Sequence, residues 1–450
     1  MMPVPQTSMI SLVTDSAVND NAFPEHRGVV MKSLFLILAF LCFPWTSFAG
    51  TYADFAADAQ ASKTSLLAIS NQDHLLLAPQ KEWCSRPAYA AMALTPDGKL
   101  DAEFRPETPT NPLDPQDRFQ CQISQLITLK SGQLLQVTNA ENLDFFGAFL
   151  TKINADGTTN IRFGKKGFVP FFKKKRATVV VVYEHSDETI YGINVQCEYA
   201  SGGKACSSYL FHLLKDGSFD TKFGDNGFVL RNVSTTYDGF TNMAPAQLRI
   251  VDGKIIVVEH RYQFNHEIHL FKYQMNGSLM AGFDATGGRT LRVIRAEQYH
   301  GGHCVADSKL TQDSVYIASG CDDDKSAIVT RHHLNGDLDP SFGNGQGQVV
   351  LPLNLVSYQR IPFVNIAALA SGQIAVSIAV AWPAANDNGS ILTSVLTTHL
   401  DSTGQLGKWG KSEKFLPGPV FHLHAESVVD SQNRVILMLE GNWVVTTPMI

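Results

Sequence analysis

A phrase built around a turn glycine recurs six times along the chain, and it constrains the fold more than any other feature. DGSFDTKFGDNG (Asp216–Gly227) is one complete copy of this turn phrase, and GDLDPSFGNG (Gly336–Gly345) is another. Successive turn glycines lie 59, 60, 60, 59 and 68 residues apart, at Gly98, Gly157, Gly217, Gly277, Gly336 and Gly404. A fixed period of this size predicts supersecondary units that bury their apolar faces against one another.

A second recurring phrase lies between the copies, with a short polar turn between two β-rich apolar strands. VDGKIIVV (Val251–Val258) and LKSGQLLQV (Leu129–Val137) are examples. Gly and Asp beside such alternation predict a tight hairpin, because they tolerate the positive φ that the turn needs. A third strand precedes each turn phrase and a fourth follows it. Four antiparallel strands, a to d, in about sixty residues are typical of one β-propeller blade, so the sequence predicts an all-β propeller.

The number of blades follows from two counts that differ by one. The chain carries seven a–b hairpins but six turn phrases, and the last unit stops after its third strand, within Asn442–Ile450. An unpaired sheet edge is a liability, so we expect the segment Tyr52–Ala61 to supply the missing outer strand. The prediction is a seven-bladed ring closed by the N-terminal segment. A six-bladed ring with a leftover half-unit is the alternative.

Composition and the N-terminal region indicate an exported globular protein. The chain of 450 residues is 44% hydrophobic and 17% charged, with a net charge of −6, which does not suit a nucleic-acid surface. Residues 31–49 read as a signal peptide, with Lys32 before an apolar run and Ser47-Phe48-Ala49 as the cleavage site. We expect residues 1–30 to be a disordered, non-native extension. Residues 50–450 then form one propeller domain, a monomer with no membrane span after cleavage.

Cysteine usage agrees with export to the periplasm or beyond. Without Cys42 of the signal peptide, six cysteines remain, an even number in a compartment where disulfides persist. The predicted pairs are Cys84–Cys121, Cys197–Cys206 and Cys304–Cys321. Free thiols in the core are the alternative.

The two phrases together resemble the delta-60 repeat family. DGSFDTKFGDNG, GDLDPSFGNG and the strand VDGKIIVV carry the resemblance, which covers nearly all of residues 64–440. The sixth copy departs from the pattern. The resemblance implies an exported bacterial β-propeller and implies no activity and no functional residues.

Candidate ligand-binding residues lie in the d–a and b–c loops, which vary in length and would share one face of a propeller. Variable loops on a rigid scaffold commonly carry binding. His266 is one candidate in such a loop. The others are Arg118, Tyr237, Arg261, Tyr262, Tyr299, His300, His303, Tyr358, Arg360, Trp382, His422 and His424.

Two groups of residues could in principle bind a metal ion, but a structural role is the better interpretation of both. His300 and His303 could join His422 or His424 around a metal ion, but isolated histidines near strand ends are more often structural. Asp220 and Asp339 could ligate calcium, yet no copy of the turn phrase has calcium-loop spacing. We therefore expect no metal and no cofactor. We expect the repeated phenylalanines Phe163, Phe223, Phe283 and Phe342 to plug the spaces between blades.

A basic residue recurs five positions before the turn glycine in five copies, as Lys152, His212, Lys272, Arg331 and His399. This periodicity indicates a structural role. Each residue either faces outward or contacts the adjoining blade.

The sequence lacks a nucleophile elbow, a P-loop and a zinc-protease helix motif. We therefore predict a non-catalytic binding protein whose ligand is a protein, a peptide or a carbohydrate. The alternative is a propeller enzyme, namely a hydrolase, a lyase or a quinone-cofactor dehydrogenase, with its active site at the mouth of the central channel.

Overall fold

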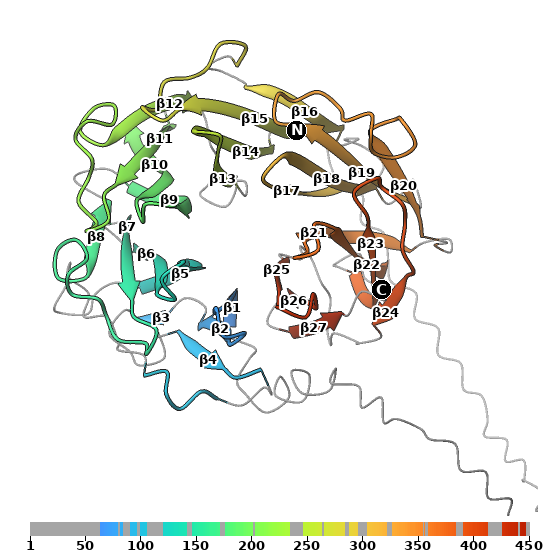
Figure 1. The fold of residues 1–450 in the computed structure, drawn as a ribbon, viewed down its shortest axis with the longest axis horizontal. Helices are drawn as coiled ribbons and strands as arrows, with labels where there is room; N and C mark the ends of the chain where they lie inside the picture. The colour runs from blue at the N-terminus through green and yellow to red at the C-terminus, as the bar shows by residue number, and fades with distance from the viewer. Residues whose placement is uncertain are drawn as a thin grey trace, which may run out of the picture. The chain divides into compact units, whose positions relative to one another are not determined.

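The protein is an all-β propeller of antiparallel sheets (Figure 1). Every described residue belongs to the unit Phe48–Ile450. No described segment forms a helix that is long and apolar enough to cross a bilayer. The computed structural model describes residues 64–79, 82–83, 91–96, 100–105, 120–141, 146–171, 176–200, 203–234, 246–262, 265–283, 288–295, 304–321, 326–353, 355, 359–383, 390–412, 425–439 and 442–446.

Four of the sheets have the predicted strand count, and in each the strands pair in chain order. The first comprises β9 (Arg176–Glu184), β10 (Ile190–Ala200), β11 (Gly203–Leu213) and β12 (Phe228–Ser234). The second comprises β13 (Ala246–Val251), β14 (Lys254–Tyr262), β15 (Asn265–Gln274) and β16 (Arg289–Arg295). The third comprises β17 (Cys304–Leu310), β18 (Ser314–Cys321), β19 (Ser326–His333) and β20 (Gln348–Pro352). The fourth comprises β21 (Arg360–Ala368), β22 (Ile374–Pro383), β23 (Ser390–Leu400) and β24 (Gly410–Ser412).

The remaining sheets contain the two ends of the repeat array. One has the order β1 (Thr64–Ile69), β2 (Leu75–Pro79) and β4 (Met92–Leu94). The last has the order β25 (Ala425–Val429), β26 (Val435–Leu439) and β27 (Asn442–Thr446), so no outer strand follows β27 in the described chain. The five-stranded sheet comprises β3 (Glu82–Trp83), β5 (Gln120–Thr128), β6 (Leu134–Glu141), β7 (Phe146–Ile153) and β8 (Phe168–Phe171).

Strand β3 was not predicted. It leaves the first sheet and adds to the edge of β5, where Glu82 lies opposite Cys121. This edge would otherwise present unpaired backbone groups, so a short extra strand covers it. Sequence repetition could not reveal β3, because no other unit carries an equivalent strand among its described residues.

Each copy of the turn phrase folds back onto its own strand c, which was not predicted. In the third copy the amide of Gly217 donates to the carbonyl of Leu214 at 2.8 Å. A bridge across the turn then closes each copy, at Leu94–Leu100, Ile153–Thr159, Leu213–Phe219, Tyr273–Leu279, His332–Leu338 and Leu400–Leu406. The common geometry explains why the phrase is repeated.

The turn glycine also contacts the preceding unit. Gly217 has a φ of 82°, and a Cβ there would lie 2.7 Å from the amide nitrogen of Gly164 and 2.9 Å from the ring of Phe163. The amide of Gly164 donates to the carbonyl of Asp216 at 2.6 Å. Glycine is therefore required at this position for two reasons, the positive φ and the close approach of the preceding unit.

The phenylalanines of the turn phrases fill the space between sheets. Phe163 and Phe223 are each 2% exposed and Phe342 is 0% exposed, which confirms the predicted plug. Phe283 belongs to a degenerate copy and is only partly buried, although it still packs against the adjoining core.

The recurring basic residue turns inward rather than outward. Nδ1 of His212 lies 3.0 Å from the carboxylate of Asp220, and Nε of Arg331 lies 2.7 Å from that of Asp339. Both basic side chains are buried, and the guanidinium of Arg331 stacks over the ring of Phe342 at 5.0 Å. The expectation of an outward-facing residue is wrong here, because the turn phrase supplies both a carboxylate and an aromatic ring. Contact with the adjoining unit is confirmed for Arg331, which also donates to the carbonyl of Ser402.

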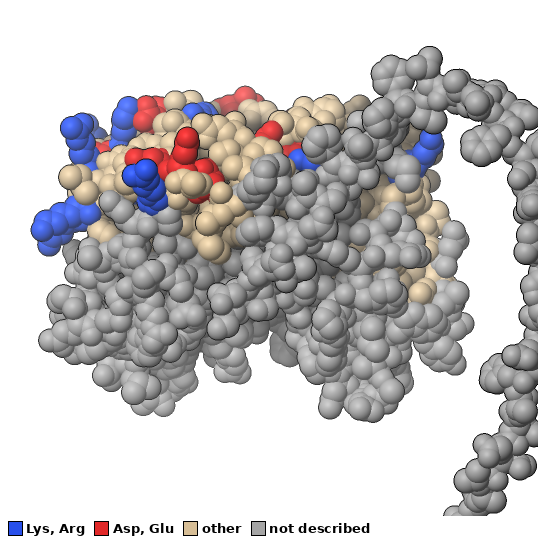
Figure 2. Space-filling view, turned by 90° about the horizontal axis from the view of Figure 1, so that it is seen from below, with Lys and Arg blue, Asp and Glu red and all other residues tan. Residues whose placement is uncertain are grey.

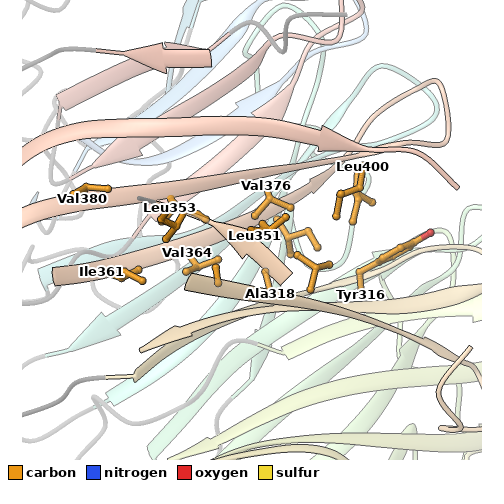
Figure 3. Close-up of a cluster of buried hydrophobic side chains, with 14 of the residues drawn as sticks. Tyr316, Ala318, Leu351, Leu353, Ile361, Val364, Val376, Val380 and Leu400 are labelled. Atoms are coloured by element: carbon orange, nitrogen blue, oxygen red, sulfur yellow. The ribbon is translucent and has the colours of Figure 1, made fainter. Parts of the chain in front are cut away.

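Apart from Tyr316 and Phe342, the buried core between the β17–β20 and β21–β24 sheets is aliphatic. Figure 3 shows Tyr316 and Ala318 of β18 facing Val364 and Val376 of the β21–β24 sheet. Burial of such residues at roughly 25 cal/mol per Å² is the main force that holds one sheet against the next.

The first and last sheets are also neighbours. Strand β1 contacts β25, and the blue and red ends of the colour gradient meet there in Figure 1. The amide of Ser431 donates to the carboxylate of Asp73 at 3.1 Å. The amide of Ala370 makes the equivalent bond to the side chain of Asn433 at 2.9 Å, between two consecutive sheets. The predicted closing strand, Tyr52–Ala61, lies outside the described residues, as do residues 1–49.

Candidate functional site

The predicted ligand-binding residues that the structure describes lie at strand ends away from the a–b turns. Arg261 and Tyr262 end β14, Arg360 begins β21, and Trp382 is the penultimate residue of β22. Eight others lie outside the described residues, namely Arg118, Tyr237, Tyr299, His300, His303, Tyr358, His422 and His424.

His266 takes part in a buried chain of polar side chains. It follows the first residue of β15, and its Nε2 lies 2.9 Å from Nδ1 of His260 on β14. Nε2 of His260 lies 2.7 Å from Oγ of Ser308 on β17. The three side chains are between 2% and 6% exposed. The chain therefore joins the β13–β16 sheet to the β17–β20 sheet.

Burial keeps both histidines neutral. It lowers the pKa of His260 to about 3, with a further lowering by His266, and it lowers the pKa of His266 to about 4. Desolvation disfavours the charged imidazolium because the protein interior cannot replace its hydration. In the neutral state one nitrogen of each ring donates and the other accepts, which suits a relay of hydrogen bonds.

The Ser308–His260 pair has the spacing of a nucleophile and its base, but its environment does not suit catalysis. Both side chains are 2% exposed, so a substrate has no access to Oγ of Ser308. Nε2 of Gln247 lies 3.3 Å from the same oxygen. A histidine with a pKa of about 3 is also a weak base at neutral pH. The arrangement serves the contact between sheets.

The neighbouring residues of β17 face the other side of the strand. One carboxylate oxygen of Asp307 accepts from the amide of Ile366 at 2.9 Å and from Nδ2 of Asn365 at 3.1 Å, both on β21. The other accepts from the amide of Ser308 at 2.8 Å. Burial outweighs these bonds and raises the pKa of Asp307 to about 6. Lys309, two residues further on, lies on the same side of β17.

Side chains from one inner strand satisfy the edge of the next at several junctions. Gln125 accepts from the amide of Val182 at 3.2 Å, and Gln247 accepts from the amide of Leu310 at 2.7 Å. Asp307 and Ile366 repeat the arrangement. The signal in the sequence is a Gln or Asp within strand a, and it was not predicted.

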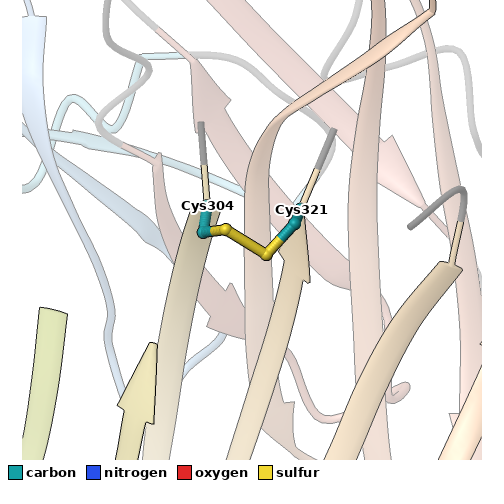
Figure 4. Close-up of a disulfide and its surroundings, with 2 residues drawn as sticks. All are labelled: Cys304 and Cys321. Atoms are coloured by element: carbon teal, nitrogen blue, oxygen red, sulfur yellow. A yellow bond between two sulfur atoms is a disulfide. The ribbon is translucent and has the colours of Figure 1, made fainter. Parts of the chain in front are cut away.

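One disulfide is confirmed, between Cys304 and Cys321 (Figure 4). The two residues lie opposite each other in the β17–β18 register, at the end remote from the a–b turn. Cys197 is also disulfide-bonded, and Cys206 lies opposite it in the β10–β11 register. Cys84 lies outside the described residues, so its pairing with Cys121 stays a prediction. A disulfide is typical of an oxidising environment.

Positive and negative side chains are mixed on the side of the protein that Figure 2 draws. There, among the described residues, Lys and Arg lie interspersed with Asp and Glu. Lys215 and Glu188 form one such mixed pair at 2.6 Å. Among the described residues, no group of three or more His, Cys, Asp or Glu side chains is arranged to hold a metal ion. His300, His303, His422 and His424 lie outside them.

Comparisons with known proteins show likeness in fold alone. No protein-family model matches the chain, and no curated protein sequence matches it. The polysaccharide lyase Uly1 is similar at 10% identity and a TM-score of 0.39, over 72% of this chain and 80% of the lyase. Prolyl oligopeptidase B from Galerina marginata is similar at 11% identity and a TM-score of 0.42, over 87% of this chain and half of the peptidase. A protein of unknown function from Dyadobacter fermentans DSM 18053 is similar at 12% identity and a TM-score of 0.36, over 74% of this chain and 92% of that protein. Likenesses this remote carry no functional argument.

Proposed function

We propose that the chain is an exported, non-catalytic binding protein that uses the loop-bearing end of a seven-bladed propeller. The observation that carries the proposal is the contrast between the two ends of the sheets. The a–b turns have two to five residues, whereas the d–a connections range from four residues, 172–175, to twelve, 413–424. Variable connections at one end of a rigid scaffold commonly carry the residues that bind a ligand.

The seven-bladed ring is supported by the contact between the first and last sheets. Asp73 accepts from Ser431 in the manner in which Asn433 accepts from Ala370 at an internal junction. In the proposal residues 52–61 pair with β27 and complete the last blade. Deletion of residues 50–61 should then lower the melting temperature by many degrees. An unchanged melting temperature would contradict closure by this segment.

Export is supported by the confirmed disulfide and by the predicted signal peptide. The first residue of the purified protein should be Gly50, because cleavage is expected after Ala49. Sequencing of the mature N-terminus after cell fractionation tests this. A protein that keeps residues 31–49 in the cytoplasmic fraction would contradict the proposal, and so would one whose native start precedes Met31.

Binding is tested at the strand ends that carry Arg261, Tyr262 and Trp382. The purified protein is applied to arrays of glycans and peptides, and the ligands it retains are measured again with two variants. We expect Arg261→Ala combined with Trp382→Ala to abolish retention. Lys215→Ala, at the turn-bearing end, should leave it unchanged. Equal retention by both variants would show that the wrong end was chosen.

The alternative of a propeller enzyme requires an accessible nucleophile or acid–base pair. Ser308 and His260 do not supply one, because they are sealed between two sheets and His260 is a poor base. Incubation of the protein with the retained ligand, followed by mass spectrometry, separates the two hypotheses. Chemical turnover of the ligand would favour the enzyme.

A further inference from the structure

The dipeptide Asn-Gly occurs at four places among the described residues, each time in a turn. The asparagines are Asn226, Asn276, Asn335 and Asn344, and a further copy, Asn388–Gly389, lies outside the described residues. In this dipeptide the main-chain nitrogen of the glycine can attack the side-chain amide of the asparagine, because glycine has no Cβ to hinder the approach. Asparagine is accordingly one of the thermally labile residues of proteins. The reactivity of each copy depends on how the fold holds the glycine nitrogen and the asparagine side chain.

The fold occupies both groups in three of the four copies. The amides of Gly227, Gly277 and Gly336 each donate to a main-chain carbonyl, at 2.8 or 2.9 Å. The same three glycines are buried. The side chains of the asparagines that precede them are hydrogen-bonded as well. Attack at these three copies therefore requires the turn to open first.

Asn344–Gly345 is held differently. Both residues are exposed, and among the described residues neither the amide of Gly345 nor the side chain of Asn344 has a hydrogen-bond partner. A Cβ on Gly345 would lie 4.0 Å from its nearest neighbour outside the turn, the carbonyl oxygen of Pro340. The backbone of this turn therefore has room to rotate, and its nucleophile is free.

Asn226–Gly227 is the matched comparison, because its backbone has the same conformation. The two residues have φ values of 52° and 94°, against 57° and 87° for Asn344 and Gly345. In both copies an amide-to-carbonyl hydrogen bond of 3.2 Å closes the turn around the dipeptide. These are the features of a type I′ turn, the usual setting of Asn-Gly. The two copies differ in their hydrogen bonds and burial, and not in local conformation.

One additional residue explains why the nitrogen of Gly345 is free. In the third turn phrase the amide that returns to the phenylalanine carbonyl belongs to Gly227, four residues after Phe223. In the fifth it belongs to Gly347, five residues after Phe342. The longer connection moves the Asn-Gly turn away from the returning amide, so Gly345 is left without this bond.

We propose that Asn344 is a site of spontaneous covalent modification, at which a succinimide forms and then opens to aspartate or isoaspartate. The nitrogen of Gly345 loses its proton and bonds to Cγ of Asn344, while the bond from Cγ to Nδ2 breaks and ammonia leaves. Water then opens the ring. Hydrolysis between the nitrogen and Cγ gives aspartate, and hydrolysis between the nitrogen and the main-chain carbonyl carbon gives isoaspartate. Water is the only co-reactant.

The modified residue lies at a junction between two sheets. The amide of Gly343, directly before Asn344, donates to the carbonyl of Thr403 at 2.8 Å, in the turn phrase of the β21–β24 sheet. Both products add a negative charge, and isoaspartate also adds a methylene to the main chain. Isoaspartate therefore weakens this junction.

The proposal is tested by following the four sites in the full mature protein during incubation at mildly alkaline pH. Peptide mapping by mass spectrometry measures the deamidation of each asparagine. We expect Asn344 to react at least tenfold faster than Asn226, Asn276 and Asn335. A parallel incubation in urea is the control, because the four sites should react at similar rates once the fold is removed. Equal rates at Asn344 and Asn226 in the folded protein would overturn the proposal.

A variant separates the role of the glycine nitrogen from that of the side chain. Asp225→Ala removes the partner of the Asn226 side chain but leaves the bond of Gly227 to Phe223. We expect Asn226 to remain slow, because its nucleophile is still occupied. A rise to the rate of Asn344 would contradict the role given to the free nitrogen of Gly345.

The effect on the junction is measured with aged protein, freed of unreacted chain by anion exchange. It should melt at a lower temperature than the variant Asn344→Asp, which has the charge without the extra methylene. Equal melting temperatures would refute the weakening of the junction. None of these measurements involves a ligand, so their outcome is independent of the proposed binding function.

Discussion

Two kinds of junction hold consecutive sheets together, and they differ in what the sequence reveals of them. At the turn-bearing end, Gly217 packs on Phe163 and the same contact recurs between Gly404 and Phe342. At the inner strands, His266, His260 and Ser308 make a polar junction that, among the described residues, occurs at one pair of sheets. The first junction builds the propeller, whereas the second adds individual properties such as charge and sensitivity to pH. A repeated contact is therefore evidence of scaffold, and a unique polar contact is the better place to look for function.

The largest effect should come from the phenylalanine plug. Phe342→Ala removes a ring that is 0% exposed, so we expect a loss of about 3–5 kcal/mol in the free energy of unfolding. Phe283→Ala is the matched control, since Phe283 is partly exposed and should cost less. Urea denaturation followed by fluorescence measures both. Equal losses would mean that the plug does not depend on burial.

A smaller but still large effect is expected at the turn glycine. Gly217→Ala places a Cβ 2.7 Å from a backbone nitrogen at a φ of 82°, so we expect a loss of about 2–4 kcal/mol. Gly253→Ala provides a control with a φ of 64° and no atom within 4 Å of the new Cβ, and it should lose about 1 kcal/mol. If the two variants were equally stable, φ alone would decide and close approach would not matter.

The polar junction should make the free energy of unfolding depend on pH. The pKa values of His260 and His266, about 3 and about 4, lie below the value of about 6.5 for an unfolded histidine. The unfolded chain therefore binds more protons in this window, and stability is lost as the pH falls from 6.5 toward 4. Each histidine contributes roughly 1.4 kcal/mol per pH unit. His266→Gln should flatten the profile, measured as the free energy of unfolding between pH 7 and pH 4.5. An unchanged slope would contradict a buried neutral His266.

Asp307 should change the free energy of unfolding with pH in the opposite direction. Its pKa of about 6 lies above the unfolded value, so the folded state holds the proton longer and stability falls as the pH rises from about 4 to 6. Asp307→Asn should remove this term while an amide oxygen still accepts from Ile366. The same pH series of unfolding measurements tests it, with a steeper net rise of stability in the variant as the expected result.

The smallest effect concerns the junction of the two chain ends. Asp73→Ala removes the acceptor for Ser431, and Asn433→Ala removes the equivalent acceptor for Ala370. Both residues also have a φ near 60°, which alanine disfavours. Each substitution should therefore cost about 1–2 kcal/mol in the free energy of unfolding, with the larger loss at Asp73, which accepts from both the amide and the hydroxyl of Ser431. A loss at Asn433 without one at Asp73 would show that the first and last sheets separate in solution.

The sequence by itself determined the repeated part of this protein. Spacing of the turn glycines, the Asp-Gly and Ser-Gly hairpins and the recurring phenylalanines predicted the sheets and the plug, because these features depend on local backbone conformation and on a period that every unit shares. The pairing of Cys304 with Cys321 followed from two strands of one hairpin. Only the tertiary structure decided which side chains meet across different units. The His260–Ser308 chain, the inward turn of Arg331 and the extra strand β3 join residues that are distant in sequence or occur once, and no local rule or periodicity encodes such contacts.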